Sequence, residues 1–183
     1  MLRSAAFCLL LAGCAPMAAE HQADASFRKA LVEQLASQDD QAEVEYRQII
    51  ALGFNWSTVW NNLAVIAAHR HQFRISRHLL AQAVSCNDRD LVALTNYGVM
   101  SFYLSDFREA RRTLVDAQQL RHEILARIPT YGHDEYQHDH YERVTEVLVK
   151  TAERYLQRID RAELGVETPI ASDVIAALQP ARF

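Results

Sequence analysis

An internal repeat constrains the fold of this chain more than any other feature of its sequence. When "VWNNLAVIAAHRHQFRISRHLLAQAV" is moved forward by 34 positions, it falls over "ALTNYGVMSFYLSDFREARRTLVDAQ". Similar residue types then coincide: Asn62 with Asn96, Ala64 with Gly98, Phe73 with Phe107, Leu80 with Leu114 and Ala83 with Ala117. Each copy holds two amphipathic helical stretches, so the spacing predicts pairs of helices that pack on neighbouring pairs.

An earlier, degenerate copy precedes these two. Its second helix, "DQAEVEYRQIIALG", keeps the same register, whereas its first helix (Phe27, Ala30, Leu31 and Leu35) needs a one-residue slip. Only five glycines and four prolines occur in the chain, which favours an all-α fold. We therefore expect three repeats over residues 24–128, with limits 24–56, 57–90 and 91–128.

The two clear copies resemble the tetratricopeptide repeat family in their period and in their openings, Trp60-x2-Leu63-Ala64 and Leu94-x2-Tyr97-Gly98. The resemblance implies an α-solenoid whose first helices line a groove for a segment of a protein partner. The groove residues it implies are Thr58, Asn61, Val65, His69, Val92, Thr95, Val99, Phe102 and Tyr103. This set contains no Lys or Arg, unlike the repeats that clamp carboxylates, so we expect an extended or hydrophobic ligand whose backbone is read by Asn side chains.

The region after the repeats divides at "PTYG". We expect a polar loop over 129–138 and a long amphipathic capping helix over 139–163, whose apolar positions step by three or four. Alternatively, this helix reaches into the groove or pairs with a second copy of the chain. The tail, 164–183, is expected to hold a short, loosely attached helix from Ser172 to Leu178.

The opening segment, 1–13, has the layout of a secretory signal, with Arg3 before a short apolar run. The sequence Leu11-Ala12-Gly13-Cys14 closely resembles the lipobox of bacterial lipoproteins. The resemblance implies cleavage before Cys14, acylation of that cysteine (palmitate or a similar chain) and, since Ala15 follows, sorting to the periplasmic face of the outer membrane. Acyl chains give stable membrane anchoring. We expect residues 14–23 to form a flexible tether.

The charge and the titratable residues exclude several functions. Without Arg3, 18 of the 19 basic residues remain against 23 acidic ones, which argues against nucleic acid as a partner. No nucleophile, phosphate-loop or cofactor motif stands out, so we predict no enzyme activity and no cofactor. The weak metal-ligand candidates His133, Asp134, His138 and His140 have ligand types suited to zinc, but their spacing fits a polar loop better.

Short lipoproteins with such repeats are similar to assembly factors of pilus and secretion systems, pilotin-like proteins of type IV or Tad pili that help a secretin ring assemble. The resemblance therefore implies a periplasmic scaffold that binds a secretin or another envelope component. One alternative is an adaptor that docks cell-wall enzymes or proteases at the outer membrane. The other is a metal-binding protein built on the cluster at 133–140.

Overall fold

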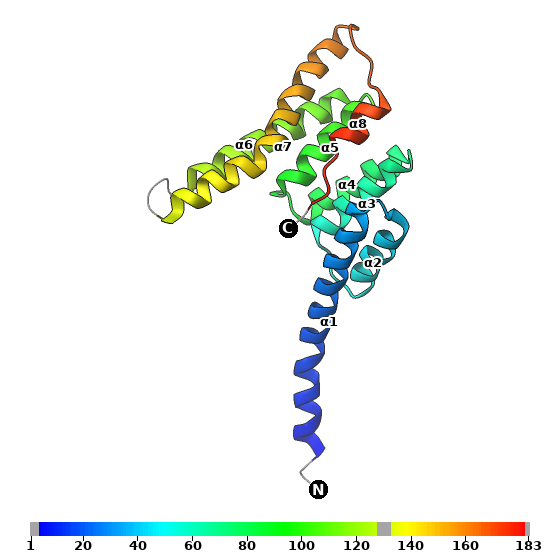
Figure 1. Cartoon of the computed structure of the whole chain (residues 1–183), viewed down its shortest axis with the longest axis vertical. Coiled ribbons are helices and arrows are strands. Elements are labelled where there is room, and N and C mark those ends of the chain that lie inside the picture. The colour runs from blue at the N-terminus through cyan, green and yellow to red at the C-terminus, as the bar shows by residue number, and fades with distance from the viewer. Residues whose placement is uncertain (1–3, 128–132, 182–183) are drawn as a thin grey trace. The chain divides into compact units, whose positions relative to one another are not determined.

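The regular structure of the chain is helical throughout the part that the computed structural model describes. That part is residues 4–127 and 133–181, with side chains described from residue 17 onward except at 133–140 and 144. Its helices are α1 (Ser4–Leu35), α2 (Asp39–Ala51), α3 (Ser57–His69), α4 (Phe73–Cys86), α5 (Leu91–Tyr103), α6 (Phe107–Arg127), α7 (His133–Glu163) and α8 (Ala171–Ala177) (Figure 1). The expected all-α, solenoid-like fold is confirmed. Two compact units, Met1–Asn55 and Trp56–Phe183, are described separately.

The period of the sequence repeat recurs in the backbone of all three helical hairpins. In each hairpin, the turn that joins its two helices contains one non-glycine residue with positive φ. These residues are Ser37 (60°), His71 (58°) and Ser105 (62°), and successive ones are separated by one repeat period. The last of these turns shows the shared pattern, in which Ser105 N–H donates to the carbonyl of Phe102 and Asp106 N–H to that of Ser101, both at 2.9 Å. This is the hydrogen bonding of a Schellman helix end. The same register holds in the first hairpin, so the expected one-residue slip is wrong.

The first unit consists of the antiparallel pair α1 and α2. Ala30 is fully buried, and Tyr46 of α2 donates a 2.9 Å hydrogen bond from its hydroxyl to Oε1 of Gln34. Helix α1 also includes residues 14–23, the segment expected to be a flexible tether. This segment contains no glycine and ends at Ala23, which is fully buried, so helical structure propagates through it from the packed end.

The second unit contains the other two hairpins, α3 with α4 and α5 with α6, joined by packing of α4 on α5. Close approach of α5 and α6 depends on Gly98, where an added Cβ would lie 2.5 Å from Cγ of Leu114. The two repeats are also linked at their starts. Asp90 caps α5 by accepting 3.0 Å hydrogen bonds from the N–H groups of Val92 and Ala93, and its other oxygen accepts one from Ser57 Oγ at 2.7 Å.

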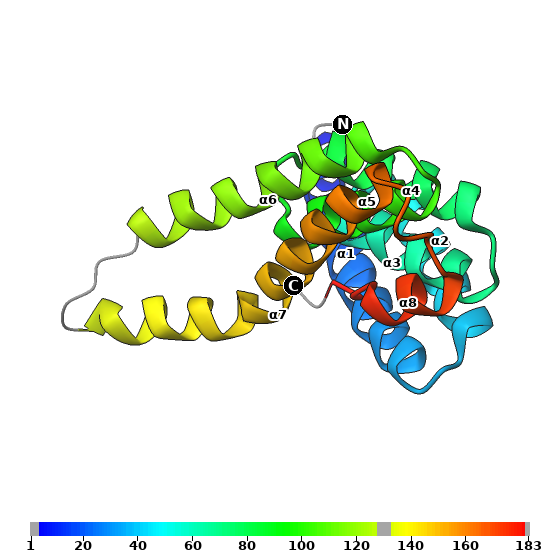
Figure 2. The same ribbon diagram turned by 90° about the horizontal axis from the view of Figure 1, so that it is seen from above.

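Helix α7 packs against α5 and α6, as expected of a capping helix (Figure 2). It begins at His133, so residues 133–138 are helical, whereas the sequence predicted a loop there. Gly132 is the last helix breaker before Gly165, and nothing in between interrupts the backbone ladder.

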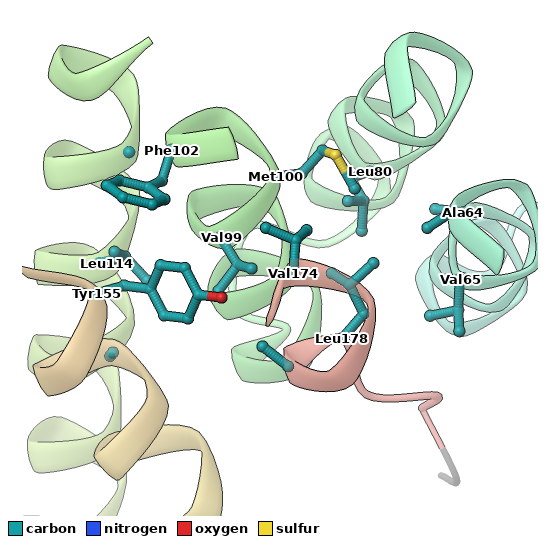
Figure 3. Close-up of a cluster of buried hydrophobic side chains, with 14 of the residues drawn as sticks. Ala64, Val65, Leu80, Val99, Met100, Phe102, Leu114, Tyr155, Val174 and Leu178 are labelled. Atoms are coloured by element: carbon teal, nitrogen blue, oxygen red, sulfur yellow. The ribbon is translucent and has the colours of Figure 1, made fainter. Parts of the chain in front are cut away.

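Helix α8 is firmly packed, contrary to the expected loose attachment. Val174, Ala177 and Leu178 share one face at helical spacing and are at most 7% exposed. Figure 3 shows Val174 and Leu178 pointing toward Val99 of α5 and Val65 of α3. The expected limits, Ser172 to Leu178, are one residue too late at each end, and Ile170 takes the N-cap position.

Candidate functional site

The residues expected to line a groove lie on α3 and α5, and the chain's own C-terminal elements cover most of them. Asn61, Val65, Thr95, Val99 and Phe102 are buried, at most 2% exposed. Thr58, Val92 and Tyr103 are partly buried, and His69 is exposed at the end of α3. The sequence predicted an open groove at these residues and did not predict the C-terminal elements that cover most of them.

Helix α7 covers the end of this face that contains Phe102. The ring of Tyr155 meets Phe102 edge to face, with centroids 5.3 Å apart, and the guanidinium of Arg158 lies 5.0 Å from the centroid of each ring. Arg158 pairs with Glu167 and, at 3.2 Å, with Asp173. Burial raises the pKa of Tyr155 to about 12. This part of the face is therefore a closed core with a charged rim.

The rest of the face carries Asn61, Asn62 and Asn96, three fully buried side chains that we call the asparagine face. They hold the extended segment Leu178–Ala181, which follows α8; Leu178 has φ −69° and ψ 132°. A buried amide costs free energy unless its donor and acceptor are satisfied. Here the satisfying groups come from a backbone 83 to 119 residues away in sequence.

Asn62 and Asn96 each pair with both the N–H and the carbonyl of one residue of this segment. Asn96 donates to the carbonyl of Gln179 at 2.6 Å and accepts from its N–H at 3.0 Å. Asn62 does the same with Ala181, at 2.9 Å and 2.6 Å. The asparagine face therefore recognises an extended backbone as a neighbouring β-strand would.

Asn61 fixes the position of the other two amides. Its Nδ2 donates to Asn62 Oδ1 at 3.2 Å and to the carbonyl of Gln179 at 3.0 Å. Its Oδ1 accepts from Nδ2 of Asn96 at 2.8 Å. The network leaves little rotational freedom to the three amides while residues 179 and 181 are in place.

Sequence reasoning named Asn61 as a site residue but missed Asn62 and Asn96. The signal was present, because these two coincide when the repeats are superimposed and stand among apolar neighbours in "VWNNLAVI" and "ALTNYGVM". A polar residue repeated at a core position needs a partner that the helix itself does not supply. The repeated pattern therefore indicates that a segment outside these two helices satisfies the amides, as residues 179 and 181 do here.

The remaining candidates lie outside the described side chains. Cys14 has its backbone in α1, and His133, Asp134, His138 and His140 have theirs in the first turns of α7. Among the side chains that are described, no three His, Cys, Asp or Glu residues are grouped so as to hold a metal ion. Within the described residues, every helix is too short or too polar to span a membrane.

The comparisons with known proteins assign this chain to no family. No model of a protein family matches this sequence, and neither does any curated protein.

Proposed function

We propose that this protein is a lipid-anchored periplasmic scaffold of the outer membrane that binds an extended segment of a partner protein. The partner is an envelope assembly component, a secretin of a pilus or secretion system. In this proposal the repeats supply the binding surface, and acylated Cys14 supplies the attachment to the membrane.

The pairing of Asn62 and Asn96 with an extended backbone supports the binding role. Two asparagines in successive repeats contact residues 179 and 181, alternate positions of one extended chain. Alternate residues of an extended segment lie on the same side, roughly 6.5 Å apart. A face with this spacing suits polypeptide ligands and offers no charged group or nucleophile for chemistry.

The N-terminal helix is compatible with processing at Cys14. In the uncleaved chain Pro16 lies inside α1, and proline is disfavoured in a helix interior because it has no N–H to donate. After cleavage, Pro16 would be the third residue of the mature chain, in a first turn where proline is tolerated. The stretch of helix from Cys14 to buried Ala23 has a length of about 14 Å. The anchor would therefore hold the first unit close to the membrane surface.

Site-specific photo-crosslinking in intact cells tests this proposal. A photo-reactive residue replaces Thr58, which is partly buried on α3, or Ile75, which is 52% exposed on α4 and serves as the control. We expect a secretin to be captured from position 58 but not from position 75. The proposal is wrong if position 58 captures no envelope protein, and recovery of a cell-wall hydrolase would favour the adaptor function instead.

Cys14→Ser tests the anchor separately. We expect the substituted chain to leave the outer-membrane fraction and to lose labelling by radioactive palmitate, and the secretin to lose its multimeric form. A chain that stays in the membrane fraction without acyl groups contradicts the anchoring proposal.

A further inference from the structure

The segment Leu178–Ala181 occupies the asparagine face as a peptide ligand would. It is not part of a helix, and among the hydrogen bonds described above its N–H and carbonyl groups at 179 and 181 pair with asparagine side chains. Figure 1 shows this stretch leaving α8 and running past α5 and α3 toward the C-terminus. The chain thus fills its own binding surface.

The contacts define which sequences this surface accepts. Leu178 and Ala181 are 5% and 2% exposed, whereas Gln179 and Pro180 are partly exposed. The side chain of Gln179 donates a long hydrogen bond, 3.5 Å, to the carbonyl of Ala177. Position 180 is proline, which has no N–H to donate, and the pairing skips it. The ligand pattern is therefore a large apolar residue, two variable residues of which the second can be proline, and then a small residue.

The place of the segment outside the helices, and the way it is joined to the rest of the chain, allow it to be displaced. The helix before it, α8, is joined to α7 by Leu164–Ile170, in which Gly165 has φ +71° and Leu164, Val166 and Ile170 are more than half exposed. Residues 179–181 lie outside the helix pairs α3–α4 and α5–α6 and bond to side chains of α3 and α5, so releasing them breaks no backbone hydrogen bond of those helices. Their release would expose the amides of Asn61, Asn62 and Asn96 to a competing backbone.

We propose that Leu178–Ala181 is an internal ligand that closes the asparagine face until an extended segment of a partner protein, with the same apolar-x-Pro-small pattern, displaces it. This inference rests on the proposed function, because it assumes that the face binds another polypeptide. A tethered segment competes at an effective concentration in the millimolar range. A free partner segment therefore binds weakly unless the partner is itself held nearby.

Peptide binding to the full chain tests the inference. The probe is a fluorescent peptide, Ala-Leu-Gln-Pro-Ala, the sequence of residues 177–181, and the measurement is fluorescence anisotropy. The test variant Gln179→Pro/Ala181→Pro removes the two N–H donors that pair with Asn96 and Asn62, while proline remains compatible with an extended chain. The matched control Gln179→Ala keeps the N–H and changes only the side chain.

We expect the double-proline variant to bind the probe at least tenfold more tightly than the wild-type chain, because the tethered competitor is weakened. Gln179→Ala should bind the probe as weakly as wild type. A probe with proline at both substituted positions should not bind. If the folded double variant fails to bind the probe, or if wild type binds it equally well, the inference is overturned.

Hydrogen exchange of the wild-type chain provides a second measurement that does not depend on the variant folding. The amides of Gln179 and Ala181 should exchange faster than those at the centre of α5, because they open without unfolding the repeats. Exchange at the same slow rate would show that the segment leaves only on global unfolding, which contradicts displacement. A double-proline variant that binds the probe but captures nothing from membranes would overturn the proposed envelope partner, while Leu178–Ala181 would still be a displaceable segment on the asparagine face.

Discussion

Substitution of Gly98 by alanine tests the helix contact on which the repeat depends. A Cβ at this position would lie 2.5 Å from Cγ and 2.7 Å from Cδ2 of Leu114, and 2.9 Å from Oγ1 of Thr113. Ordinary contact begins at 3.4 Å, so the fully buried Leu114 must retreat by about 0.9 Å. Overpacking of this kind costs about 1–3 kcal/mol, and the better helix propensity of alanine returns about 1 kcal/mol.

A double-mutant cycle separates these two effects. Leu114→Ala alone should cost about 2–5 kcal/mol through the cavity that it leaves. In Gly98→Ala/Leu114→Ala the steric clash with Leu114 is absent. The double variant should therefore be more stable than the sum of the single changes by about 1–3 kcal/mol. The close contact between the added Cβ at position 98 and Thr113 is present with either residue at position 114, so its free-energy cost cancels in the cycle.

Urea unfolding of the four proteins, followed by circular dichroism, measures the coupling. The control cycle pairs Gly98→Ala with Leu120→Ala, a buried residue of the same helix α6 that lies about 9 Å further along its axis. The control cycle should be additive to within about 0.5 kcal/mol. Additivity in the Leu114 cycle as well would refute the reasoning, since it would mean that Gly98 is not required for close packing.

Three further predictions concern the turns and the covered end of the face. Ser105→Gly should raise the free energy of unfolding by about 1 kcal/mol, because φ is positive there, while Ser105→Ala should not; chemical denaturation distinguishes them. Ultraviolet difference titration should find one tyrosine with a pKa of about 12, absent in Tyr155→Phe. Because burial raises the pKa of Tyr155 above the ordinary 10, the neutral phenol contributes fully to stability below pH 10, and this contribution declines as the pH rises toward 12. A stability difference between wild type and Tyr155→Phe that does not change with pH would contradict this. Arg158→Met should destabilise the fold by about 1–3 kcal/mol. Arg158→Lys should recover less than half of the loss, because lysine lacks the guanidinium that lies 5.0 Å from the centroids of the Phe102 and Tyr155 rings; full recovery in thermal melts would refute this role of the guanidinium.

The sequence by itself determined the three hairpins. Helix α5 begins at Leu91, one repeat period after Ser57 at the start of α3, and α6 begins at Phe107, one period after Phe73 at the start of α4. Both starts agree with the sequence shift. Helical periodicity and turn residues are local signals, and each repeat packs mainly on its neighbour in sequence. The resemblance of the repeats to the tetratricopeptide family, and not the period alone, implies Asn61, Val65 and Val99 as residues of the inner face, and all three are buried in the structure.

Only the tertiary structure decided what covers that face. Nothing periodic marks residues 178–181, and a short extended segment has no conformational preference strong enough to fix its position. Its conformation is held by Asn62 and Asn96, and the same backbone compensates part of the cost of burying these two amides. Such mutual dependence between groups about a hundred residues apart is set by the packed chain, because no local pattern encodes it.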